Sequence, residues 1–124
     1  MTNAADTLAA YTDRINAQDF DLLTDLIAHD AVFWFTSGTH RGMAAIRAAF
    51  EATWAAIGPD EHYWLDQLEW IAEGDEVATC VYRFNWKTLQ DGKPVAGSGR
   101  GTTVLKRVDD RWYIVHEHLS GDPA

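Results

Sequence analysis

Cysteine, proline and basic residues are all scarce in this 124-residue chain, which has one cysteine, three prolines, and ten lysines and arginines against nineteen acidic residues. The single Cys80 cannot form an internal disulfide bond. The net charge of −9 repels nucleic-acid phosphates and anionic lipid surfaces, so we expect neither nucleic acid nor membrane as a partner. No apolar run approaches the roughly 18 residues of a membrane span, and the first residues lack the pattern of a secretory leader. These absences predict a cytoplasmic protein.

What is present is the composition of a globular domain. Hydrophobic residues make up 47% of the chain and charged residues 23%. The length is that of one domain with a substantial core, and we find no repeat or linker. We therefore predict a single domain over residues 1–124.

The first half of the chain carries helical patterns. Apolar residues recur at helical spacing within about residues 4–17, 22–27 and 46–57, and Gly58 and Pro59 end the third of these segments. These patterns predict three helices.

The second half carries strand patterns. A short β-branched and aromatic run at residues 32–35 is followed by four longer ones at about 62–73, 76–89, 95–107 and 111–119. Short turn sequences rich in Asp and Gly separate the long runs, so neighbouring strands must be antiparallel. We predict an α+β fold, a cone of three N-terminal helices packed on one face of a curved antiparallel sheet.

Two histidines in the last predicted strand are the first candidates for chemistry. His116 and His118 are two residues apart, so both should lie on one face of the strand. If residues 109–110 form a two-residue turn, Thr103 lies opposite His116. Three alternating glycines in the preceding strand share that face, and their missing side chains would leave a cavity in front of the two imidazoles. We predict His116 and His118 as catalytic residues and Thr103 as a ligand-binding residue.

Two alternatives for this pair remain open. The histidines can be structural, with their rings hydrogen-bonded to Ser120 or to backbone carbonyls. They can also begin a metal site, but such a site needs at least a third ligand, and no other metal-binding spacing occurs in the chain. We therefore expect no metal and no other cofactor.

A second candidate is the pair Asp66 and Arg83. With a hairpin turn at residues 74–75, these two residues lie directly across from each other. They can form a buried pair that holds a polar ligand, or a solvated pair on the outer surface of the sheet. We add Trp34 and Trp64 to the predicted ligand-binding residues, because large flat side chains form pocket walls.

The strand at residues 76–89 is apolar on both faces, so other parts of the protein must shield each face from water. Helices can cover only one face, and we expect a second subunit on the other, in a homodimer formed by the convex face of the sheet. In the last strand we place Tyr113, Val115 and Leu119, around Glu117, on that same face.

Three stretches of the sequence resemble a known superfamily. They are residues 11–19 (YTDRINAQD), residues 30–42 together with the following Ala45 and Ile46, and residues 111–121 (RWYIVHEHLSG). These stretches and the order of elements resemble the nuclear-transport-factor-2-like cone. That superfamily includes steroid delta-isomerases, SnoaL-like polyketide cyclases and the association domain of calcium/calmodulin-dependent kinase. The resemblance covers nearly the whole chain.

The resemblance implies a binding site for a small apolar or aromatic molecule. Tyr11 matches the tyrosine of the steroid isomerases, so we predict it as a catalytic residue. The position of their carboxylate base holds Phe35, and the position of their second acid falls near Thr103, which has no acidic neighbour on its face. His116 or His118 would then supply the base. We expect a SnoaL-like small-molecule-binding protein, with isomerase or cyclase activity possible; the alternative is a non-catalytic association domain.

Overall fold

The computed structural model describes residues 3–123. In chain order the elements of this part are α1 (Ala4–Ile15), the 3₁₀ turn η1 (Phe20–Leu22), β1 (Ile27–Phe35), β2 (Gly38–Arg41), α2 (Met43–Ile57), β3 (His62–Glu73), β4 (Val77–Gln90), β5 (Lys93–Val108) and β6 (Arg111–Gly121). The α+β class is confirmed, and the four long strands lie close to their predicted positions.

The strands form one sheet in the order β2-β1-β6-β5-β4-β3. Strands β3 to β6 are the predicted antiparallel meander. The prediction of an entirely antiparallel sheet is wrong, because β1 runs parallel to β6 and places Phe33 beside Glu117. Most of the chain separates these two strands, and a long crossover is what parallel neighbours require. The short edge strand β2, which the sequence did not reveal, pairs with β1.

The prediction of three helices is also wrong, because the segment at residues 22–27 does not form a helix. The chain makes the short turn η1, which Asp19 caps, and then enters β1. Ile27 is fully buried and pairs with Ile114 of β6, so sheet hydrogen bonds replace helical ones there. Most of the apolar residues of this segment are buried in the core, as a helix would also have placed them, but the backbone that carries them is not helical.

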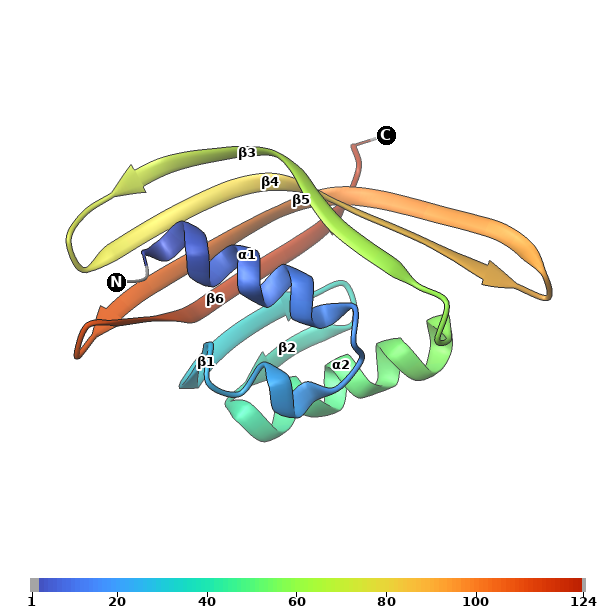
Figure 1. Ribbon diagram of the computed structural model, residues 1–124, viewed down its shortest axis with the longest axis horizontal. Coiled ribbons are helices and arrows are strands. Elements are labelled where there is room, and N and C mark those ends of the chain that lie inside the picture. Colours follow the sequence, from blue (N-terminus) through green and yellow to red (C-terminus); the bar gives the residue numbers. More distant parts are fainter. Residues whose placement is uncertain (1–2, 124) are drawn as a thin grey trace.

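The two α-helices lie on the same side of the curved sheet (Figure 1). A capping box between Asn3 and Asp6 begins α1, which contacts β3, β5 and β6 and buries Leu8, Tyr11 and Ile15. Helix α2 contacts β1 and β2. Within residues 3–123, neither helix is long and apolar enough to cross a membrane. Among residues 3–123, no helix lies on the opposite face of the sheet (Figure 1).

Aromatic side chains of β4 lie over the alternating glycines of β5. The cross-strand pairs are Tyr82 with Gly101, Phe84 with Gly99, and Trp86 with Gly97. A Cβ atom added at any of these glycines would overlap the ring opposite it. The glycines therefore leave room, as expected from the sequence, but rings of the neighbouring strand fill that room.

Replacing Gly99 with alanine is expected to lower the free energy of unfolding by about 2 kcal/mol, the typical cost of forcing atoms into a packed interior. The new Cβ would overlap the Phe84 ring and the backbone carbonyl oxygen of Ser120. Gly121→Ala is the matched control, because nothing lies within 4 Å of its added Cβ, and its effect should stay within about 0.5 kcal/mol. Urea unfolding of both variants measures the difference, and equal destabilisation would contradict the overlap.

The register between β5 and β6 changes at one residue. The pairs from Val108–Arg111 to Leu105–Ile114 follow the predicted two-residue turn. Val115 is then an extra residue on β6, so Thr103 lies opposite Glu117 and not opposite His116 as predicted. A shift of one residue moves every later side chain to the other face. Glu117 therefore faces the helices, and the predicted placement of the histidines on that face is wrong.

Candidate active site

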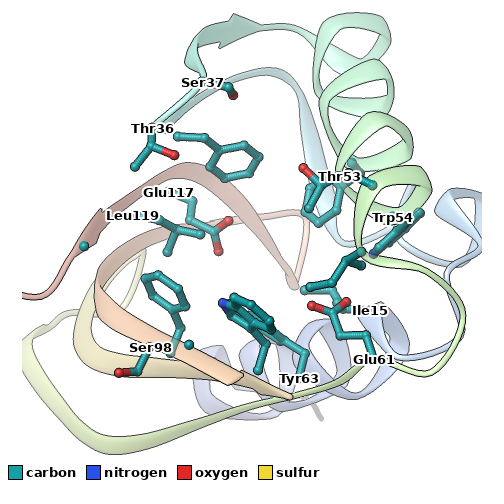
Figure 2. A pocket seen from close by; sticks show the side chains of 18 of the residues that line it. Ile15, Thr36, Ser37, Thr53, Trp54, Glu61, Tyr63, Ser98, Glu117 and Leu119 are labelled. Atoms are coloured by element: carbon teal, nitrogen blue, oxygen red, sulfur yellow. The ribbon is translucent and has the colours of Figure 1, made fainter. Parts of the chain in front are cut away.

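A cavity of about 570 Å³ lies between α2, the start of β3 and the inner face of β4, β5 and β6 (Figure 2). Its walls are mainly aromatic, from Phe35, Phe50, Trp54, Tyr63, Phe84 and Trp86. Alternation along β4 directs Phe84 and Trp86 inward, and the glycines opposite let both rings lie flat against β5. The volume is that of a pocket for a small organic molecule.

Glu117 of β6 is the most buried charged residue that lines this cavity, with 2% of its surface exposed. The Tyr11 hydroxyl donates a hydrogen bond to its Oε2 at 3.0 Å, and the Tyr82 hydroxyl donates one to its Oε1 at 3.3 Å. Tyr82 is in turn 2.7 Å from the Thr103 hydroxyl. Side chains from α1, β4 and β5 thus hold one carboxyl group on β6.

Burial raises the pKa of Glu117 from its usual 4.5 to about 7, although the hydrogen bonds from Tyr11 and Tyr82 act in the opposite direction. Burial also raises the pKa values of Tyr11 and Tyr82, and the charge of Glu117 raises them further. Both tyrosines therefore stay protonated donors at neutral pH. Glu117 is divided between its acid and base forms there, which is the condition for general acid–base chemistry.

Each oxygen of the Glu117 carboxylate can accept two hydrogen bonds. Tyr11 provides one of the two to Oε2, and Tyr82 provides one of the two to Oε1. A second position on each oxygen is left for a ligand, and the carboxyl group points into the cavity in Figure 2. The arrangement can take a proton from a bound molecule and return it.

Glu61 is a second carboxylate on the cavity wall, just before the start of β3. Burial raises its pKa, and a hydrogen bond from Gln18 partly offsets this effect. Figure 2 shows the carboxyl groups of Glu61 and Glu117 on opposite sides of the cavity.

His116, His118 and Trp34 form an aromatic cluster on the outer face of the sheet. The Trp34 ring lies 5.3 Å from the His116 ring and 5.5 Å from the His118 ring, measured between centroids. Nδ1 of His116 is 2.6 Å from the backbone oxygen of Val32. None of the three lines the cavity at Glu117. The predicted catalytic roles of the two histidines and the ligand-binding role of Trp34 stay predictions, but the register that suggested the histidines is wrong.

Asp66 and Arg83 are opposite each other, as predicted, and both alternate with inward-facing residues. They do not pair: Arg83 binds Asp122 at 2.9 Å and 3.0 Å, and donates to Ser98 at 2.9 Å. Trp64 lies on the same outer face, stacked on His62 with centroids 5.2 Å apart. The structure thus separates this predicted group from the cavity.

Of the predicted site residues, the structure brings Tyr11 and Thr103 together around Glu117. Three residues of the site were not predicted from the sequence: Glu117, Tyr82 and Glu61. A signal for Glu117 was present, because it is the one acidic residue between Arg111 and Gly121. Within residues 3–123, no three His, Cys, Asp or Glu side chains are grouped as a metal site would require.

Comparison with known proteins identifies the family. A sequence profile of the SnoaL-like domain matches residues 4–124. Comparison with curated protein sequences finds no match.

Solved structures show the same fold. One is a nuclear transport factor 2-like superfamily protein from Salmonella enterica, with a TM-score of 0.84, 21% identity, and coverage of 95% of this chain and 87% of that one. The association domain of CaMKII from C. elegans has a TM-score of 0.79, 19% identity, and coverage of 94% and 91%. A proposed ketosteroid isomerase from Shewanella frigidimarina has a TM-score of 0.79, 15% identity, and coverage of 94% of each chain.

Identities this low support the fold and not the activity. The fold is therefore nuclear-transport-factor-2-like, and the profile match assigns the family. The chain belongs to the SnoaL-like domain family.

Proposed function

We propose that this protein is an enzyme that moves a proton on a small apolar or aromatic substrate, with Glu117 as the general base and acid. One observation carries the proposal: a buried carboxyl group with a pKa of about 7 lines an aromatic cavity between two tyrosine hydroxyls. Active sites commonly hold such a group in such a place.

The chemistry that fits is proton transfer next to a carbonyl group. Ionised Glu117 takes a proton from the carbon beside the carbonyl, which leaves an enolate and a neutral carboxylic acid. In an isomerisation, Glu117 then returns the proton to another carbon of the same skeleton. In a cyclisation, the enolate carbon attacks a second carbonyl carbon of the same molecule, and Glu117 returns the proton to the oxygen of that carbonyl group. Neither reaction needs a further reactant. Tyr11 and Tyr82 are positioning residues in this scheme, because they hold the carboxyl group and do not line the cavity.

One structure with this fold is that of a proposed ketosteroid isomerase, and at 15% identity the likeness extends to the fold alone. The base differs from the one that the steroid isomerases would lead us to expect. Phe35 stands at that position and contributes an apolar wall to the cavity. Glu117, from the last strand, takes over the role.

Deuterium exchange tests the proposal without knowledge of the natural substrate. The bicyclic ketone 2-tetralone is incubated with the protein in D₂O, and NMR follows the loss of the protons beside its carbonyl group. Exchange faster than in buffer, and dependent on Glu117, supports the proposal. A rate equal to that in buffer, with the ketone shown to bind, contradicts it.

We also propose that the protein is a homodimer, whether it acts as an enzyme or as an association domain. In the described part of the chain no helix covers the outer face of the sheet. The exposed Val77 is one of the apolar residues that alternation directs to that face. The dimer surface differs from the one expected from the sequence, since Leu119 lines the inner cavity with Glu117. Light scattering at micromolar concentration should give about twice 13.9 kDa. A mass of one chain would contradict the dimer.

A further inference from the structure

The charged residues on the wall of the cavity are acidic. Glu61 and Glu117 are the two charged residues that line it, and no lysine, arginine or histidine does so within the described part of the chain. The protein as a whole carries a net charge of −9. An anionic ligand would therefore lose its hydration without gaining a positive partner.

Glu61 lies where a ligand in the cavity would meet it. Its carboxyl group points into the cavity from the side opposite Glu117 (Figure 2). None of the ion pairs among residues 3–123 includes Glu61. Its side chain is partly buried, and no lysine, arginine or histidine in this part of the chain forms an ion pair with it.

The side chains that share the cavity with Glu61 are suited to hold a cation. Trp54, Tyr63 and Trp86 line the same cavity, and the faces of such rings attract ammonium groups. Aromatic rings together with a carboxylate form the kind of site that recognises an amine, because the rings attract the charge while the carboxylate accepts the N–H hydrogen bonds.

We propose that the cavity selects arylalkyl amines, in which a carbon separates the nitrogen from the aromatic ring, with the cationic nitrogen held by Glu61 among the aromatic walls and the apolar body extending toward Glu117. The reaction of such a ligand at Glu117 rests on the proposed function, whereas the binding of its amine at Glu61 does not. The site thus prefers cationic to neutral ligands of the same shape, and neutral to anionic ones.

Three naphthalene probes with the same ring system test this charge preference. They are 2-naphthylmethylamine, 2-naphthalenemethanol and 2-naphthoate, which are cationic, neutral and anionic at pH 7. Isothermal titration calorimetry on the whole protein should give an affinity at least about tenfold higher for the amine than for the alcohol, as expected for a charged hydrogen bond, and the weakest binding for the naphthoate.

Glu61→Gln should remove the preference for the amine and leave alcohol binding within about twofold. Glu69→Gln removes the same charge from an exposed position on β3 and is the matched control, with unchanged affinities expected. Equal affinities for amine and alcohol in the unaltered protein would overturn the inference. So would an amine preference that survives in Glu61→Gln, or one that disappears only in Glu117→Gln.

The two proposals fail separately. If exchange into 2-tetralone depends on Glu117 but the amine has no preference, the amine site is wrong and the proposed reaction stands. If the amine is preferred through Glu61 but no exchange occurs, the binding site stands and the reaction is wrong.

Discussion

Glu117→Gln is expected to slow deuterium exchange into 2-tetralone by at least about a hundredfold, because positioned acid–base groups contribute about 10² to 10⁴ to a rate. The amide keeps the size of the side chain and can still contact Tyr11 and Tyr82, but it cannot accept a proton from carbon. In the unaltered protein, the rate should rise with pH through about 7, where Glu117 ionises. NMR measures both effects.

Two further variants make this result specific. Glu69→Gln removes a carboxylate from the exposed part of β3 and should leave the rate unchanged. His116→Gln tests the histidine that the sequence analysis favoured. Exchange that survives in Glu117→Gln and is lost in a folded His116→Gln would overturn the role of Glu117 and support the histidine.

The stability of the protein is expected to fall as the pH rises through the range in which Glu117 ionises. The pKa of Glu117 is about 7 in the folded protein, against 4.5 for an unperturbed glutamate. Between these two values the folded state binds more protons than the unfolded state, so the free energy of unfolding decreases with increasing pH. The difference between the two pKa values corresponds to a decrease of about 3 kcal/mol in the free energy of unfolding as the pH rises from about 4.5 to above about 7.

Urea unfolding at several pH values measures this loss, and Glu117→Gln isolates it from other titrating groups. The amide does not ionise, so the difference in stability between the variant and the unaltered protein should change by about 3 kcal/mol over the same range, in favour of the variant at high pH. A constant difference across this range would show that the pKa of Glu117 is the same in both states.

Local patterns were sufficient for most of the elements. The four long strands follow from alternating apolar residues between short polar turns, and the turns have the conformations that their residues favour. Asp91 and Gly92 both have positive φ, as do Asp109 and Asp110. Helix α2 ends at Gly58, as the glycine and the following proline predict.

The misassigned helix at residues 22–27 shows where local patterns fail. An apolar segment that must be buried can be helical or extended, and its spacing does not distinguish the two over so few residues. The pairing of Ile27 with Ile114, which is far away in the chain, decided for the strand. The parallel neighbours β1 and β6 could not be predicted for the same reason.

The position of Glu117 in the site depends on a bulge at Val115, which no sequence pattern indicated. The turn at Asp109 and Asp110 set the predicted register correctly for its first four pairs, until Val115 bulged out of β6. That bulge exchanged the faces of the following residues, so Glu117 took the place that His116 was expected to have.

Periodicity, turn residues and short motifs are local properties of the chain, and they were enough to predict the class of the fold, the meander of long strands and the family. They also pointed to Tyr11 and Thr103, which lie in the hydrogen-bonded group around Glu117, while the catalytic and ligand-binding roles predicted for them stay predictions. Which carboxylate lines the cavity, and the raised pKa of that group, became known from the three-dimensional structure. Both depend on burial and on hydrogen bonds from residues distant in the chain, and on the single-residue bulge that turns Glu117 toward the helices.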